Sequence, residues 1–148
     1  MTDACKALRR YGQDILTSDG MKSERGFMQH GTINCCRHSV NVALLSVRIA
    51  SRLSLRCDTR SLVRGALLHD YFLYDWHVPS DEHKWHGFHH AAKACELAGR
   101  DFQLSPLERD IIARHMFPLT LTPPRSREGW IVCLADKLCA LRETLVRR

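Results

Sequence analysis

The sequence lacks any apolar run approaching the roughly 20 residues that span a bilayer. Residues 1–6 also lack the apolar stretch of a signal peptide. There is no C-x-x-C pair, and the seven cysteines are an odd number scattered among helical patterns. A membrane protein and a disulfide framework are therefore not expected. We interpret the cysteines as small buried hydrophobes of a cytoplasmic protein.

Convincing strand alternation, internal repeats and low-complexity segments are absent as well. The 148 residues fit one domain, and 45% hydrophobic with 26% charged residues excludes a disordered chain. The formal charge is +6, which suits a phosphate-bearing ligand. Because Lys and Arg form no clustered basic stripe and no recognition motif is present, nucleic-acid binding is not expected.

Helical periodicity and caps divide the chain into helices and loops. Asp58 is a good N-cap, and Ser105-Pro106-Leu107-Glu108 is a capping box with proline at the first helical position. Loops are expected at residues 17–31, at the polar aromatic stretch 72–87, and around the prolines from 118 to 124. The predicted helices are residues 3–16, 33–53, 59–71, 90–98, 106–116 and 127–146. The pattern predicts an all-α bundle of five to six helices.

Histidine and aspartate occur on faces of these helices that are otherwise apolar. Nine histidines are present, five of them between positions 77 and 90. Four predicted helices carry the residues of interest: His38, His69, Asp70, His115 and Asp136. One such residue is usually a core residue with a single hydrogen bond. A set from four helices is different, because a shared cation would stabilise buried carboxylates that otherwise need strong partners.

The order of these residues resembles the HD-domain superfamily of metal-dependent phosphohydrolases. The stretches that carry the resemblance are Arg37-His38-Ser39-Val40, Ala66-Leu67-Leu68-His69-Asp70, Ile111-Ile112-Ala113-Arg114-His115 and Leu134-Ala135-Asp136-Lys137. They extend from about residue 31 to 140. The resemblance therefore implies a single HD-like domain over residues 1–148, with a motif-bearing core at about 31–140.

The resemblance also implies ligands for one or two metal ions. The first shell would consist of His38, His69, Asp70 and Asp136, and Asp70 would be able to bridge to a second ion. His115 matches one of the two histidines that hold a second ion in members with two metals.

The other histidine for the second ion stays open between two positions. His90 is preferred, because it opens a predicted helix with small residues behind it. His86 is the alternative, since it is followed by glycine, as in some members, and it can also support a ligand from behind or contact the substrate. His89 is expected to point elsewhere. The segment between Asp70 and this histidine is shorter than in many members.

Three residues are candidates for catalysis. Asp70 would bridge the ions, Lys137 follows Asp136 as in many HD proteins and can contact a phosphate, and Asp75 can orient a water or hold a ligand histidine. Further candidates for phosphate contact are Arg37, Arg64, Lys93 and Arg114, although surface arginines are common on a basic protein. The aromatic residues Tyr71, Phe72, Tyr74, Trp76 and Trp85 can stack on a base or roof the pocket.

A site of this kind lowers the pKa of bound water from about 16 to about 7–9, which provides hydroxide at neutral pH. The donor set suits one or two ions of Fe, Mn, Co, Ni or Zn. The leading hypothesis is hydrolysis of a small phosphate ester or anhydride, with a nucleotide as a candidate substrate. An HD-fold di-iron oxygenase, a non-catalytic nucleotide-binding sensor and a structural zinc site are the alternatives. No membrane partner is expected, and a homo-oligomer is left open.

Overall fold

The computed structural model describes residues 1–81 and 84–146, so His83 of the histidine-rich segment lies outside the described part. The helices are α1 (Asp3–Leu16), α2 (Asp19–Ser23), α3 (Cys35–Arg52), α4 (Thr59–Leu68), α5 (His86–Asp101), α6 (Pro106–Arg114) and α7 (Arg127–Leu145), with a 3-10 turn, η1 (Glu24–Gly26). The all-α prediction is confirmed. Among the described residues, no helix is both long enough and apolar enough to cross a membrane.

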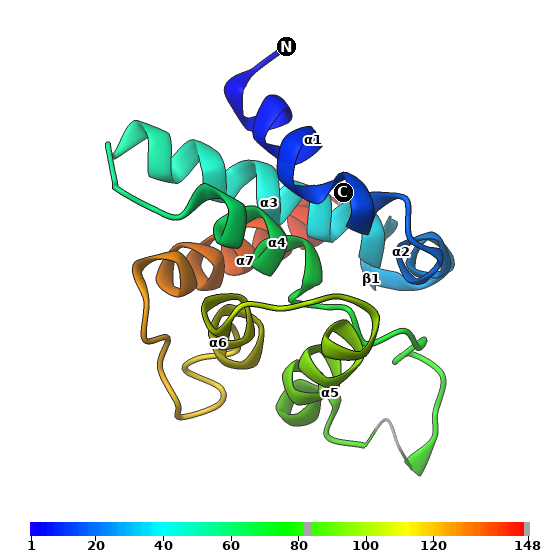
Figure 1. Cartoon of the computed structure of the whole chain (residues 1–148). Coiled ribbons are helices and arrows are strands. Elements are labelled where there is room, and N and C mark those ends of the chain that lie inside the picture. The colour runs from blue at the N-terminus through cyan, green and yellow to red at the C-terminus, as the bar shows by residue number, and fades with distance from the viewer. Residues whose placement is uncertain (82–83, 147–148) are drawn as a thin grey trace.

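Helix α4 lies at the centre of the molecule and is buried from Ser61 to Leu68. It packs against α1, α3, α6 and α7, and Figure 1 shows α1 above it and α6 below it. The predicted caps are present: Asp58 accepts from the N–H of Ser61, and Ser105 and Glu108 form the capping box of α6. The C-terminal end of α4 therefore points into the middle of the bundle.

The expectation of a plain loop at residues 17–31 is wrong. Ser18 caps the short helix α2, and a two-stranded hairpin follows, β1 (Met28–His30) and β2 (Ile33–Asn34). Gly31 has a φ of 62° in the turn between the strands, a conformation that glycine adopts without steric cost. The helix and strands in this segment are separated by glycines and are too short to show a periodicity in the sequence, which explains the expectation of a loop.

The predicted start of the fourth long helix at His90 is also wrong. Helix α5 begins at His86, directly after Trp85, whose φ is 64°. Gly87 therefore lies in the first turn. There its entropic cost of about 1 kcal/mol is offset by contacts such as the stacked rings of His86 and His90, one turn apart.

Arg64 is a structural residue rather than a phosphate contact. Its guanidinium is 2.8 Å from Asp14 of α1 and 3.4 Å from Glu108 of α6, and the residue is only 4% exposed. Buried charge of this kind is tolerated only when it is paired. The pairing ties α4 to two neighbouring helices and leaves Arg64 unable to meet a ligand.

Gly65 allows α4 and α6 to approach closely. A Cβ at this position would lie 2.6 Å from Cγ2 of Ile111. We expect Gly65→Ala to lower the free energy of unfolding by about 1–3 kcal/mol through overpacking, as measured by urea denaturation. Gly26→Ala is the control, because no heavy atom lies within 4 Å of a Cβ there. Equal losses in the two variants would contradict the close packing of α4 on α6.

Candidate metal centre

Buried imidazoles and carboxylates from five helices meet around the C-terminal end of α4. His38 comes from α3, His90 from α5 and Asp136 from α7, while His69 and His115 are the C-caps of α4 and α6. With Asp70 they form two groups that could each hold an ion: His38, His69, Asp70 and Asp136, and Asp70, His90 and His115. All six residues are buried. The structure therefore brings together residues that are up to 98 positions apart.

Asp70 belongs to both groups, with one carboxylate oxygen facing each. Its Oδ2 is 3.3 Å from Nε2 of His69 and 3.7 Å from Nε2 of His38. Its Oδ1 is 3.2 Å from Nε2 of His90 and 3.5 Å from Nε2 of His115. A carboxylate in this position can bridge two cations.

Asp136 completes the first group. Its Oδ1 is 3.0 Å from Nε2 of His38 and 3.5 Å from Nε2 of His69. The first group therefore offers two imidazole nitrogens and two carboxylate oxygens. This is a donor set that first-row transition metals accept.

Hydrogen bonds at the other ring nitrogen set the tautomer of all four histidines. Nδ1 of His38 donates to Glu143 over 2.7 Å. The remaining three donate to backbone carbonyl oxygens: His69 to Ala66, His90 to His86, and His115 to Ile112. Because a carbonyl oxygen can only accept, Nδ1 carries a hydrogen, and Nε2 faces the centre with its lone pair available when the ring is neutral.

The inward-facing atoms fit a cation in each group. Nε2 of His90 and Nε2 of His115 are 3.0 Å apart, so two lone pairs face each other unless a proton or a metal ion lies between them. Nε2 of His69 and Oδ1 of Asp70 are buried without a hydrogen-bond partner. Such atoms are costly to bury, and a metal ion would satisfy them.

The pKa shifts of these residues indicate how the cluster is protonated when no ion is bound. Burial alone would lower the pKa of His38, but its hydrogen bonds to Asp136 and Glu143 raise that pKa to about 9. Burial likewise opposes the neighbouring charges at His69 and Asp70, yet the pKa of His69 is raised and that of Asp70 is lowered. Burial lowers the pKa of His115. Protons thus neutralise the first group when no metal is bound.

Two supporting residues were missed at the sequence level. Gln29, on β1, donates to Oδ2 of Asp70 over 2.6 Å and accepts from Nε1 of Trp76 over 3.1 Å. It lies in a segment without periodicity, so no signal could have found it. Glu143 follows Asp136 by seven residues, which places it two turns away on the same face of α7. From that spacing Glu143 could have been predicted as a hydrogen-bond partner of His38.

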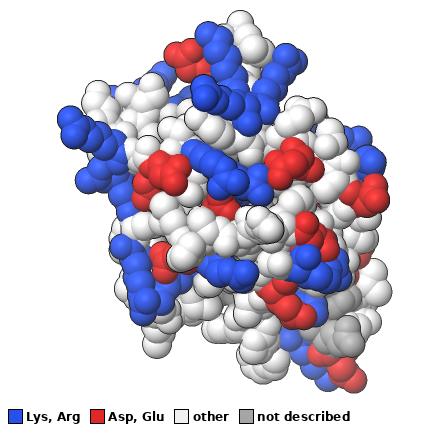
Figure 2. Space-filling model, in the orientation of Figure 1, with Lys and Arg blue, Asp and Glu red and all other residues white. Residues whose placement is uncertain are grey.

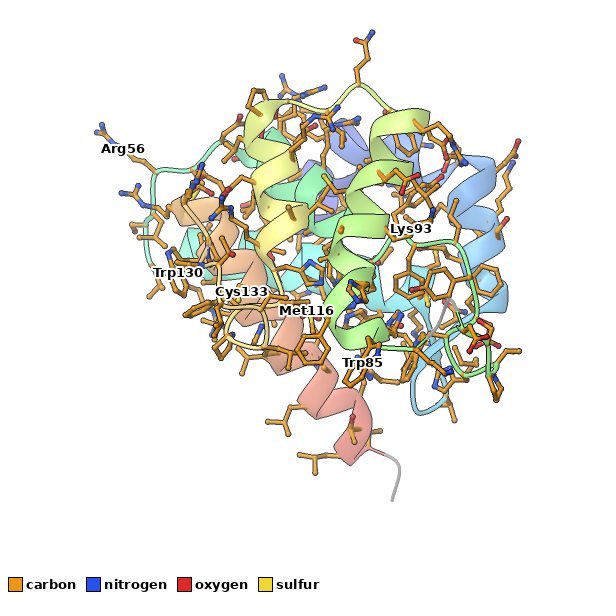
Figure 3. The ribbon with its side chains drawn as sticks, turned by 90° about the horizontal axis from the view of Figure 1, so that it is seen from below. Arg56, Trp85, Lys93, Met116, Trp130 and Cys133 are labelled. Atoms are coloured by element: carbon orange, nitrogen blue, oxygen red, sulfur yellow. The ribbon has the colours of Figure 1, made fainter. Side chains whose placement is uncertain are left out.

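The donor atoms face a cavity of about 660 Å³. The lining includes the donor residues Asp70, His90 and Asp136, the polar residues Gln29, His30, His86 and Lys137, and an apolar part with Trp76, Met116, Pro118 and Leu119. In the view of Figure 3, Met116 lies between α5 and α7. A larger groove of about 720 Å³ between α3 and α7 reaches this network only at Asn41 and Glu143. The smaller cavity is therefore the one that belongs to the centre.

Some predicted site residues are not brought into either group. Asp75 accepts from the backbone N–H of His77 over 3.0 Å and is not among the residues that line the cavity, so the structure does not bring it to either group. His86 is in neither group: its Nδ1 is 2.8 Å from the hydroxyl of Tyr74, and its ring stacks between Trp76 and His90. It therefore forms a wall of the cavity. His89 is exposed.

The residues predicted to contact phosphate or to stack on a base also differ in whether they reach the cavity. Lys137 lines the cavity, and its Nζ donates to the carbonyl oxygen of His115 over 3.0 Å. Arg114 pairs with Asp110, and Lys93 pairs with Glu96. Arg37 lies on the groove between α3 and α7. Of the five aromatic residues only Trp76 lines the cavity, whereas Tyr71 and Phe72 are buried, Tyr74 contacts His86, and Trp85 is exposed.

The comparison with protein families agrees with this geometry. A family model described as the HD domain matches residues 36–141, which is more than half of the chain. The chain therefore belongs to the HD-domain family, and the resemblance drawn from the sequence is confirmed. This is a superfamily of metal-dependent phosphohydrolases. No curated protein and no solved structure matches the chain significantly.

Metal affinity should rise with pH. The pKa of His38 is raised from 6.5 to about 9, so the metal-free folded protein keeps this proton until the pH approaches 9. The stability that the proton contributes is complete below pH 6.5 and is lost as the pH rises from 6.5 to about 9. A metal ion must displace that proton. We expect the affinity for Mn²⁺ to increase by up to about tenfold per pH unit in this window, as measured by calorimetric titration.

Glu143→Gln tests the cause, because loss of the carboxylate lowers the pKa of His38. The rise in affinity should move to lower pH in this variant. Glu128→Gln is the matched control: Glu128 is also a buried glutamate of α7, but its carboxylate accepts from the N–H of Asp58. A pH-independent affinity, or the same profile in both variants, would contradict the assignment.

Proposed function

We propose that this protein is a metal-dependent hydrolase of small phosphate monoesters, with a nucleoside monophosphate as a candidate substrate. The observation that carries the proposal is the position of Asp70, whose two oxygens face separate sets of imidazole nitrogens beside a cavity. Membership of the HD-domain family supports the same reaction class.

The side chains of the chain have distinct tasks in this proposal. His38, His69, Asp70 and Asp136 would hold one ion, and Asp70, His90 and His115 the other. When bound, divalent ions supply an acidified water as nucleophile and neutralise charge on the phosphoryl oxygens. Gln29 keeps the carboxylate of Asp70 in one orientation, because it donates to Oδ2 while it is anchored by Trp76.

The lining of the cavity supports a monoester rather than a polyphosphate. Of the described residues that line it, only Lys137 has a permanently positive side chain. The lining also includes the apolar residues Met116, Pro118 and Leu119. Its volume of about 660 Å³ is in the range of sites for small molecules. One cation and an apolar wall match a single phosphoryl group on an apolar or aromatic remainder.

Activity should depend on Asp70. We expect release of inorganic phosphate from a panel of nucleoside monophosphates and aryl phosphates with Mn²⁺, Co²⁺, Ni²⁺, Fe²⁺ or Zn²⁺. Asp70→Ala should lower kcat/KM by at least about a thousandfold, because both ions lose a ligand. Asp75→Ala is the matched control and should retain activity. No turnover with any metal, or iron- and oxygen-dependent turnover without phosphate release, would contradict the proposal.

Lys137 should act mainly in substrate binding. Removing its charge in Lys137→Met should raise KM by about tenfold and leave the metal content unchanged, because a contact with one phosphoryl oxygen is lost. Lys93→Met removes a lysine that pairs with Glu96 on the surface, and its KM should stay at the wild-type value. An unchanged KM in Lys137→Met would exclude this role.

A further inference from the structure

Helix α7 has a second apolar face that the described fold leaves uncovered. One side of the helix packs into the core through Ile131, Val132 and Ala135. On the outer side, five large apolar side chains are between 44% and 62% exposed: Trp130, Leu134, Leu138, Leu141 and Leu145. We call these five residues the α7 stripe. A helix that is apolar on both sides usually has a partner on both sides.

The stripe is continuous and straight. Its residues are separated by steps of four, four, three and four positions, which follow the period of an α-helix and keep them on one side. From Trp130 to Leu145 it extends for about 22 Å along the helix. Figure 3 shows the C-terminal turns of α7 projecting beyond the other helices, where they are open to another molecule.

No charge interrupts the stripe. Three of the four charged residues of α7 between Trp130 and Leu145 are directed elsewhere: Asp136 and Glu143 contact His38, and the ammonium of Lys137 is bound to the carbonyl oxygen of His115. The fourth, Arg142, is exposed beside Leu138 on the groove between α3 and α7, at one edge of the stripe, where its guanidinium can stay in solvent. A partner that covers the stripe therefore buries no unpaired charge, which is the usual obstacle to an apolar interface.

We propose that the α7 stripe is a homodimer interface, in which α7 of a second copy packs antiparallel against it. About half of each of the five side chains is exposed, so the stripe offers on the order of 500 Å² per copy. A symmetric pair would bury about 1,000 Å², the size at which specific interfaces begin. An isolated patch of this size is at the upper end of what monomeric proteins expose.

The spacing of the stripe is self-complementary in the antiparallel direction. With a two-fold axis near Leu138, Trp130 of each copy faces Leu145 of the other, and Leu134 faces Leu141. Two-fold interfaces use the same surface on both copies, which requires this kind of symmetry. The widest side chain thus lies at each end, and leucines pack against each other in the middle.

A membrane surface fits the stripe less well. Helices that lie on anionic lipid have Lys and Arg free along the edges of the apolar face. Of the two basic residues of α7 between Trp130 and Leu145, Lys137 has its ammonium bound at 3.0 Å to the carbonyl oxygen of His115, which leaves the exposed Arg142 as the single cation at the edge of the stripe. Figure 2 also shows acidic and basic side chains interspersed on the visible face of the molecule, with no continuous basic surface there.

The test is the oligomeric state of the full chain by sedimentation velocity over a hundredfold range of concentration. We expect a monomer–dimer equilibrium in the micromolar range. The double variant Leu134→Glu/Leu141→Glu should raise the dissociation constant of the dimer at least about 100-fold. Leu121→Glu is the matched control, because Leu121 is 89% exposed but belongs to a loop outside the stripe. It should dimerise as the wild type does.

Circular dichroism and Mn²⁺ binding serve as the check that the double variant is folded, since the stripe contains no residue of the metal centre. The orientation is tested by Leu138→Cys and Leu145→Cys, each oxidised with copper phenanthroline and compared with the wild type. Antiparallel pairing predicts a covalent dimer for Leu138→Cys alone.

A wild-type protein that is monomeric at all concentrations overturns the proposal. So does a dimer that the double variant leaves intact, or efficient cross-linking of Leu145→Cys. Co-sedimentation of a monomer with phosphatidylglycerol vesicles that is lost in the double variant would assign the stripe to a membrane surface instead.

Discussion

A single buried carboxylate organises the centre of this molecule. Asp70 is 2% exposed at the end of α4, and isolated burial of such a charge costs several kcal/mol or more. Its two oxygens face four imidazole nitrogens that come from four separate segments of the chain. The positions of α3, α4, α5 and α6 around one point are therefore required by the electrostatics of one side chain as well as by the apolar core.

The hydrogen bonds behind these imidazoles define the chemistry of the centre. Every Nδ1 donates outward, to Glu143 or to a backbone carbonyl oxygen, so every Nε2 faces inward and presents a lone pair there once its ring is neutral. Three of the four acceptors belong to the helix that carries the histidine, at the preceding turn. The tautomers are thus largely a local property of helix ends, while their convergence is a property of the fold.

The residues of helix α7 lie in three different environments. Asp136 and Glu143 face the metal centre, Ile131 and Val132 belong to the core, and the leucines of the stripe are on the outside. The stripe and the residues of the centre lie on different faces of the helix. A partner on the stripe would therefore leave the metal ligands of α7 in place and hold the projecting end of the helix.

The order of residues alone determined the helical class, the capped starts of α4 and α6, and the family, because caps, period and the His38–Asp136 set are local or sequential signals. It left His86 and His90 as alternatives, and the packed structure places His90, but not His86, in a group of donor residues. The i, i+4 stacking places His90 against Asp70 and His86 against Trp76.

Asp75 and Gln29 show two opposite ways in which the sequence alone fails to identify the residues at the site. Asp75 has the right chemistry and follows Asp70 closely, but its loop turns it toward His77. Gln29 comes from a three-residue strand with no readable pattern, yet it contacts Asp70 at 2.6 Å. Contacts across 41 residues depend on how loops close over a core, and short-range periodicity contains no information about that closure.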